Sequence, residues 1–219
     1  MKILLVNASP RKRTSRTLAL AKHVLRGCAH EGAKCEIACL SDYAIRFCRH
    51  CELCHKKVMV CPIKDSAMML ARKILDADGI IYATPNYINQ VTGALKTLFD
   101  RHSHFIHCKR LLGKYCAGVV TSGSGYDKPV ARYLKYYSII CGAQFSGAVC
   151  SRADDVDGAA EGAFTLGRKL VSDIRKKRRY RGQLARIEKG FKYFGKLIKM
   201  HKNDWREEYL YWQDQGWLA

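Results

Sequence analysis

Five short apolar runs alternate along the chain with longer segments in which apolar residues recur every three or four positions. Each run predicts a buried strand, because a strand that is covered on both faces carries apolar side chains at consecutive positions. The runs lie at residues 2–7, 34–40, 80–84, 115–121 and 144–150. The pattern therefore predicts a sheet of five strands.

The segments between these runs predict amphipathic helices. After the first run, apolar residues at helical spacing continue to Cys28, and Gly32 ends the segment. Further helices are expected after residue 66 and over residues 91–99, 128–141 and 159–179. Because strands alternate with helices, we expect a parallel α/β sheet with helices on both faces.

The pattern changes after residue 155. Gly182 is expected to break the last helix of the sheet domain, and a very basic helix with an apolar stripe follows. The stripe comprises Leu184, Ile187, Phe191, Phe194 and Ile198. All three tryptophans lie in the last fifteen residues. We expect residues 181–219 to form a basic, Trp-rich helical extension that packs on the domain at 1–180 or on a second subunit, rather than on a membrane surface.

Polar loops follow the first, third and fourth predicted strands, at residues 9–17, 84–90 and 121–126. The carboxyl ends of parallel strands meet at one edge of a sheet, where ligands bind. In the first loop, hydroxyl groups, free N–H groups and the dipole of the following helix favour an anion, and Arg11 adds a charge-assisted contact. That loop lacks glycine, so it is neither a Walker loop nor a dinucleotide-binding loop. An ordinary capped helix is the alternative.

A compact cysteine motif lies between the second and third predicted strands, in the loop at residues 47–65. Cys48, Cys51, Cys54 and Cys61 have the spacing C-x2-C-x2-C-x6-C and are followed by a proline. Four thiolates in one short loop can converge on a metal centre. Three readings stay open: an iron-sulfur cluster, a zinc ion with help from nearby histidines, or reduced cysteines without metal. Most of the other seven cysteines are expected in the core.

Charge is the most unusual feature of the composition. Lys and Arg number 39 against 19 Asp and Glu, a net charge of +20. Residues 168–202 hold fourteen of the basic residues and two acidic ones, which predicts a solvated helical face; no recognised nucleic-acid-reading motif accompanies it. The chain has no run of eighteen apolar residues and no signal-peptide pattern, so we expect a cytoplasmic protein without a membrane span.

Three segments together resemble a known family. SPRKRTS at residues 9–15, TPNYINQVTGALKTLFDR at 84–101 and TSGSG at 121–125 resemble the flavin-contacting blocks of the NAD(P)H-dependent FMN reductases, which have the flavodoxin-like fold. The cysteine loop at 47–65 is similar to that of the iron-sulfur flavoproteins, in which it ligates a [4Fe-4S] cluster. The resemblance covers residues 1–149, and its second block is the most specific.

The resemblance implies a flavodoxin-like three-layer sheet with strand order 2-1-3-4-5 and a site for FMN. The residues implied for the FMN phosphate are Ser9, Arg11, Ser15, Arg16 and Thr17, with Arg16 where the family usually has threonine. Those implied for the isoalloxazine ring are Thr84, Pro85, Asn86, Tyr87 and Asn89 on one side and Thr121, Ser122, Gly123 and Gly125 on the other. The cluster ligands implied are Cys48, Cys51, Cys54 and Cys61.

The function that follows from the resemblance is that of an FMN-dependent redox protein, which passes electrons between a [4Fe-4S] cluster and FMN. Ferredoxin or NAD(P)H would be the donor, and a quinone, peroxide or dioxygen the acceptor. A homodimer or homotetramer is expected. The alternatives are a cluster-free NAD(P)H-dependent FMN or quinone reductase and, from another class, a zinc-stabilised basic nucleic-acid-binding protein.

Overall fold

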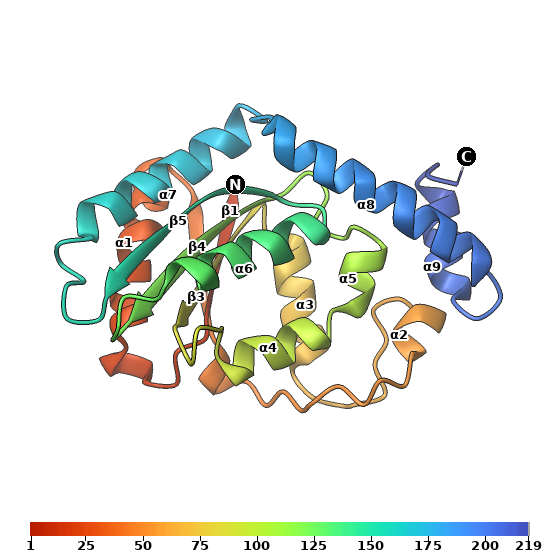
Figure 1. Ribbon diagram of the computed structural model, residues 1–219, viewed down its shortest axis with the longest axis horizontal. Helices are drawn as coiled ribbons and strands as arrows, with labels where there is room; N and C mark the ends of the chain where they lie inside the picture. Colours follow the sequence, from red (N-terminus) through yellow and green to blue (C-terminus); the bar gives the residue numbers. More distant parts are fainter. Residues whose placement is uncertain (219) are drawn as a thin grey trace.

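A parallel sheet forms the centre of the molecule (Figure 1). The computed structural model describes residues 1–218, and for residue 13 it describes only the backbone. In this part of the chain five strands pair in the order β2-β1-β3-β4-β5, all parallel. The strands are β1 (Lys2–Asn7), β2 (Lys34–Cys39), β3 (Gly79–Pro85), β4 (Tyr115–Ser122) and β5 (Gln144–Arg152). The expected flavodoxin-like strand order is confirmed.

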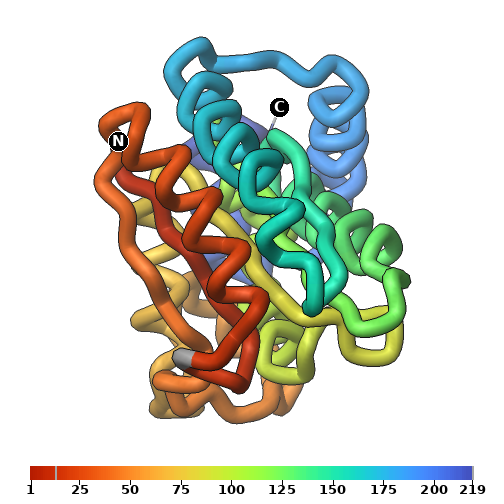
Figure 2. The backbone as a smooth tube through the Cα atoms, turned by 90° about the vertical axis from the view of Figure 1, so that its left-hand side faces the viewer, coloured from red at the N-terminus to blue at the C-terminus, as the bar shows by residue number. Residues whose placement is uncertain are grey.

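Helices cover both faces of the sheet. One face carries α1 (Arg16–His30) and α7 (Ala160–Arg175), and the other carries α3 (Ala67–Asp76), α4 (Gly93–Asp100) and α6 (Lys128–Ile140). Side chains of β1 alternate between the two cores: Ile3 and Leu5 face α1 and α7, whereas Leu4 and Val6 face α3, α4 and α6. Figure 2 shows α1 and α7 side by side. The sheet is therefore buried on both sides, as its apolar runs predict.

The remaining elements lie outside these layers. They are the short 3-10 helices η1 (Lys12–Thr14) and η2 (Leu40–Asp42) and the helices α2 (Leu53–Lys56), α5 (Ser103–His107), α8 (Arg181–Met200) and α9 (Arg206–Asp214). In Figure 1, α8 leads from the end of α7 to α9, and α9 packs against α2 of the cysteine loop. A third apolar cluster, built around Cys108, Ile198 and Trp212, joins α5, α8 and α9.

The C-terminal region departs from the sequence prediction at one point. Gly182 does not break a helix, because it lies in the first turn of α8; the chain leaves α7 at Lys177, which has a positive φ of 47°. In the tryptophan-rich tail, Trp212 is only 1% exposed, and its indole N–H donates to the His107 carbonyl oxygen. The boundary between domains at residue 180 stays a prediction. Within residues 1–218, no helix is long and apolar enough to cross a membrane.

Candidate cofactor groove and cysteine site

The loops after β1, β3 and β4 line one groove at the carboxyl edge of the sheet. Most of the residues predicted to bind FMN lie along it. The lining comprises Ser9, Arg11, Arg16, Thr17, Pro85, Asn86, Tyr87, Thr121, Ser122, Gly123 and Ala153. Ala153, which follows β5, is the one lining residue that the sequence prediction missed. Three separate loops thus form a single concave surface, which is what a cofactor that contacts all three requires.

The first loop prepares one end of the groove for an anion. The Ser15 hydroxyl caps α1 by accepting a hydrogen bond from the backbone N–H of Leu18 at 2.9 Å. Arg11 and Arg16 are exposed beside this helix N-terminus, and the first turn holds no acidic side chain. The helix dipole and two guanidinium groups therefore favour a phosphate here.

Asn86 marks the other end of the groove. Its backbone N–H donates to the Thr121 carbonyl oxygen at 2.7 Å, and its Nδ2 donates to the Tyr126 carbonyl oxygen at 2.6 Å. These bonds join the loops after β3 and β4. The side-chain Oδ1 is buried and has no hydrogen-bond partner among the described residues. A buried acceptor without a partner is costly, so this atom suits a hydrogen-bond donor on a bound polar ring.

The other predicted FMN residues do not line the groove. Thr84 is fully buried and its hydroxyl donates to the Pro85 carbonyl oxygen at 2.9 Å. Ser15 is occupied as the helix cap. Asn89 is exposed at a turn with φ 59°, and the N–H of Gly125 donates to Ser122 Oγ at 3.0 Å. These residues shape the loops, and their contact with FMN stays a prediction.

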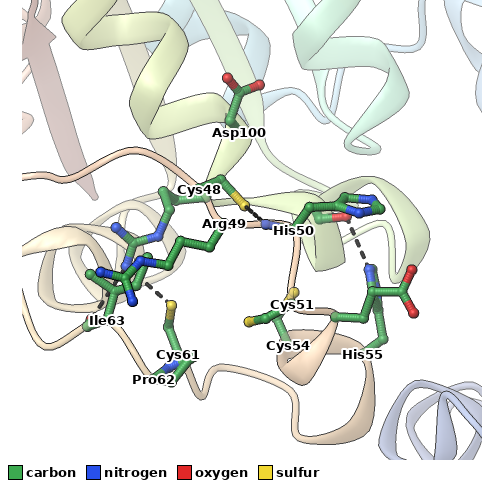
Figure 3. A pocket seen from close by; sticks show the side chains of 13 residues that line it. Cys48, Arg49, His50, Cys51, Cys54, His55, Cys61, Pro62, Ile63 and Asp100 are labelled. Carbon is green, nitrogen blue, oxygen red and sulfur yellow. Dashed lines mark hydrogen bonds between the residues drawn. The ribbon is translucent and has the colours of Figure 1, made fainter.

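The four cysteines of the loop line a second, smaller pocket (Figure 3). Cys54 comes from α2, and Cys48, Cys51 and Cys61 come from the irregular chain on either side. In Figure 3 their sulfur atoms face a common space. Burial raises the pKa of the Cys54 thiol to about 12. A metal that binds here must therefore displace a proton from Cys54.

Arg101, at the end of α4, supports this pocket. Its Nη2 donates to Cys61 Sγ at 3.2 Å, and its two terminal nitrogens contact the carboxylate of Asp65 at 2.7 and 3.1 Å. Burial acts to raise the pKa of Asp65, but the hydrogen bond from Arg101 and two backbone N–H groups hold that pKa below its ordinary value. A backbone N–H of His50 also donates to Cys48 Sγ at 3.4 Å. Two of the four sulfur atoms of the loop thus accept hydrogen bonds from their surroundings.

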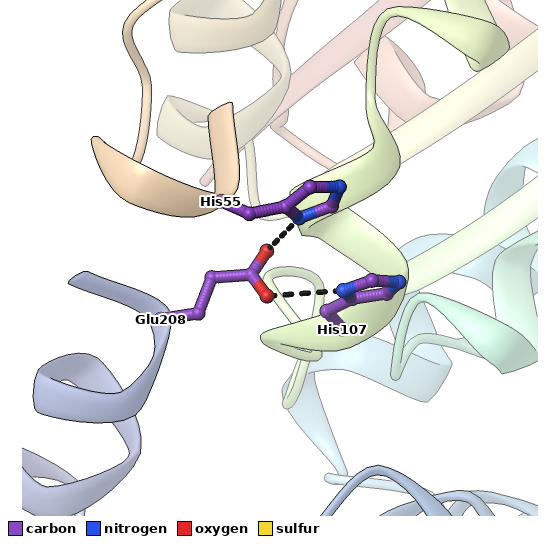
Figure 4. A group of neighbouring side chains, drawn as sticks. All are labelled: His55, His107 and Glu208. Carbon is purple, nitrogen blue, oxygen red and sulfur yellow. Dashed lines mark hydrogen bonds and ion pairs between the residues drawn. The ribbon is translucent and has the colours of Figure 1, made fainter. Parts of the chain in front are cut away.

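Behind the cysteine pocket lies a buried group that the sequence prediction missed (Figure 4). His55 Nδ1 is 2.7 Å from Glu208 Oε1, and His107 Nδ1 is 3.0 Å from Glu208 Oε2. The three side chains come from α2, α5 and α9. No local signal links them, because Glu208 lies 153 positions after His55. His55 is one of the histidines near the cysteines, and its Nδ1 is engaged by the carboxylate.

Several known proteins are similar in sequence to this chain. An iron-sulfur flavoprotein of Archaeoglobus fulgidus is 38% identical over 124 residues, which is 56% of this chain and 60% of the relative. One from Methanocaldococcus jannaschii is 37% identical over 101 residues, 46% of this chain and 51% of the relative. These two alignments thus span little more than half of each relative. A second Archaeoglobus fulgidus iron-sulfur flavoprotein is 28% identical and aligns over all of both chains.

Solved structures share the fold at low identity. A flavone reductase has a TM-score of 0.62 and 19% identity, with 80% of this chain and 63% of that chain covered. An NAD(P)H:quinone oxidoreductase from Methanothermobacter marburgensis has a TM-score of 0.58 and 15% identity, with 78% and 96% covered. The family model described as NADPH-dependent FMN reductase matches residues 1–153 of the 219. The chain therefore belongs to the NADPH-dependent FMN reductase family.

Proposed function

We propose that this protein is an FMN-dependent oxidoreductase of the iron-sulfur flavoprotein type, in which the cysteine loop holds a [4Fe-4S] cluster. The observation that carries the proposal is the convergence of Cys48, Cys51, Cys54 and Cys61 on one pocket. Four thiolates are the usual ligand set of such a cluster. The relatives named iron-sulfur flavoproteins support the same assignment.

The residues around the pocket fit a cluster better than the alternatives. Bound there, a [4Fe-4S] cluster supplies one-electron transfer. Arg101 and the N–H of His50 donate hydrogen bonds to two of the four sulfurs, and donors of this kind raise a cluster's reduction potential. The His55 Nδ1 faces Glu208, so that nitrogen is not free to complete a mixed Cys/His zinc site, and the four cysteines form a full ligand set by themselves.

The groove fits FMN by its polar groups. Arg11, Arg16 and the N-terminus of α1 would hold the phosphate, and Asn86 Oδ1 would accept a hydrogen bond from the ring. Bound FMN supplies the exchange of one or two electrons. NAD(P)H or ferredoxin is proposed as donor and a quinone, peroxide or dioxygen as acceptor. The net charge of +20 favours an acidic protein donor.

The test is the content of iron, sulfide, zinc and FMN in anaerobically purified protein, together with its visible spectrum. We expect flavin bands over a broad iron-sulfur absorption. Cys54→Ala should lose the iron and sulfide and keep FMN, because the groove and the cysteine pocket use different loops. Cys35→Ala, which removes an exposed cysteine outside the loop, should keep both.

Two outcomes would count against the proposal. Flavin without iron in the wild-type protein would indicate a cluster-free reductase. Zinc without flavin would point to a structural zinc protein and would remove the redox function altogether. If Cys54→Ala lost FMN as well as iron, the two sites would depend on each other more than their separate linings suggest.

A further inference from the structure

The cysteine loop has little support of its own. Its one helix, α2, is four residues long, and the chain around it takes positive φ angles at three non-glycine residues: His50, Glu52 and Met59. Such conformations persist only where the surrounding structure holds them. Since the loop is short of internal structure, its shape must be maintained by contacts from outside.

Besides Arg101, the contacts that hold the loop come from α9, at the other end of the sequence. Glu208 is fully buried, and its two carboxylate oxygens each face one imidazole, His55 on α2 and His107 on α5. The two rings stack with centroids 4.6 Å apart at 16° (Figure 4). Because a carboxylate only accepts hydrogen bonds, each imidazole donates through Nδ1–H. One side chain of α9 thereby ties α2 to α5.

A second set of contacts from α9 reaches the same loop. Glu207 Oε2 accepts a hydrogen bond from the backbone N–H of Val58 at 2.8 Å. The ring of Trp205, just before α9, lies 4.9 Å from the rings of both His55 and His107. Trp212, which is 1% exposed, donates its indole N–H to the His107 carbonyl oxygen at 3.1 Å. The segment from Trp205 to Trp212 therefore contacts both histidines of the group formed by His55, Glu208 and His107.

The charges in this group favour the paired arrangement. Burial acts to raise the pKa of Glu208, but hydrogen bonds from His107 and His55 bring that pKa below its ordinary value, so Glu208 is a carboxylate. Charge-assisted hydrogen bonds are stronger than neutral ones. If the carboxylate is removed, two imidazole N–H groups with little solvent access lose their hydrogen-bond partner, which destabilises the folded arrangement.

Direct hydrogen bonds describe this group better than a metal ion. Two ligands of a tetrahedral zinc ion, each about 2.1 Å from the metal, stand roughly 3.3 Å apart. His55 Nδ1 and Glu208 Oε1 are 2.7 Å apart, and His107 Nδ1 and Glu208 Oε2 are 3.0 Å apart. Both separations are hydrogen-bond distances.

We infer that α9 is a clasp for the cysteine loop and that Glu208 is the positioning residue that fixes α2, and with it Cys54, before the metal arrives. His55 is the next residue after Cys54, so the bond to Glu208 sets the orientation of the ligand's own helix. Holding ligands in place in advance reduces the ordering that binding must supply. The inference gives the C-terminal extension a role and rests on the proposed cluster for its purpose.

The experiment compares Glu208→Ala and Glu208→Gln with Asp214→Asn, which removes an exposed acidic charge from the same helix. In metal-free protein, the alkylation rate of Cys54 by iodoacetamide is measured by mass spectrometry, with buried Cys116 of β4 as the internal reference. We expect Glu208→Ala to speed the alkylation of Cys54 about tenfold. Glu208→Gln removes the same negative charge but keeps an acceptor oxygen, so it should speed Cys54 less than Glu208→Ala does. Asp214→Asn should match the wild type.

A second readout is the iron and sulfide bound per chain after anaerobic reconstitution, with FMN content as control. Glu208→Ala should bind less iron and the same FMN. Glu208→Gln keeps the shape of the side chain and one acceptor oxygen, so it should fall between Glu208→Ala and the wild type. This graded response is expected of a positioning residue and not of a mutation that unfolds the protein.

Three results would overturn the clasp. The first is equal Cys54 alkylation in Glu208→Ala and Asp214→Asn. The second is equal acceleration of Cys54 and Cys116, which means global unfolding. The third is stoichiometric zinc that Cys54→Ala retains and Glu208→Ala loses, because such zinc would be bound by Glu208 and its two histidines. Failure of the proposed function gives a different result. In that case wild-type protein takes up no iron, while Glu208→Ala still exposes Cys54.

Discussion

At the scale of single residues, the cysteine site depends on a buried ion pair. The side chains of Arg101 and Asp65 are 1% and 3% exposed, and the guanidinium contacts both carboxylate oxygens and Cys61. Two charges in such a place are tolerated only as a pair. Arg101 therefore connects the core of the sheet domain to Cys61, the last cysteine of the loop.

Removal of the arginine should destabilise the protein strongly. Arg101→Met leaves the Asp65 carboxylate buried without its cation, which we expect to lower the free energy of unfolding by about 3–5 kcal/mol. Urea unfolding of metal-free protein measures this. The matched control is Arg152→Met, whose partner Asp154 is exposed, and for which a loss of about 1 kcal/mol or less is expected. Similar losses in the two variants would contradict the assignment.

Lys109 is a second buried charge. Its Nζ donates to the Ile140 carbonyl oxygen at 2.9 Å and lies 4.4 Å from the centre of the Phe194 ring on α8. Burial lowers the pKa of Lys109 to about 8, below its ordinary value of 10.5. The unfolded chain thus binds more protons than the folded one between these two values, so this group makes stability rise with pH across that window.

The corresponding test is the pH dependence of unfolding in wild-type protein and Lys109→Met. The free energy of unfolding of the wild type, relative to the variant, should rise by up to about 3 kcal/mol between pH 8 and pH 10.5. Subtracting the variant removes the contribution of other groups that titrate in this range. A difference that stays constant with pH would show that Lys109 titrates normally.

At the scale of elements, α1 and α7 approach closely through two glycines. A Cβ on Gly27 would lie 2.0 Å from the Phe164 carbonyl oxygen, and one on Gly167 would lie 2.0 Å from the Val24 carbonyl oxygen. Each glycine therefore lets the backbone of the opposite helix come near. The close contact sets how near α1 packs to α7, and the Ser15-capped N-terminus of α1 is the anion-favouring end of the groove.

Alanine at this crossing should force the helices apart. Gly27→Ala is expected to lower the free energy of unfolding by about 1–3 kcal/mol, because the clash is with backbone that cannot rotate away. Gly162→Ala is the control: it lies in α7 with no described atom within 4 Å of the added Cβ, and it should raise stability by up to about 1 kcal/mol. Thermal unfolding compares the two, and a stabilising Gly27→Ala would refute the packing argument.

At the scale of the whole molecule, the net charge is strongly positive. With 39 basic and 19 acidic residues, the surface field favours encounter with an acidic protein such as the ferredoxin donor proposed above. The rate of reduction by an acidic ferredoxin should fall at least tenfold between about 0.05 and 0.5 M salt, because ions screen this attraction. A small neutral reductant serves as control and should show little salt dependence. Equal salt dependence for the two donors would argue against steering.

Much of the architecture could be predicted because its signals are local. The apolar runs located all five strands to within two residues, and the three polar loops met at one edge as parallel topology requires. The prediction placed the break between α7 and α8 at Gly182. In the structure, Gly182 lies in the first turn of α8, and the chain turns earlier, at Lys177, which has a positive φ. The short helices α5 and α9 were missed as separate elements, since their lengths leave little periodicity to detect.

The sequence by itself determined the positions of the strands, the polar loops of the groove and the spacing of the four cysteines, since each is a pattern among residues that are close along the chain. Only the tertiary structure decided what surrounds them. It brought Arg101 to Cys61 across 40 positions and Glu208 to His55 across 153. Contacts of this kind depend on how every intervening element packs, and no local pattern of residues encodes them.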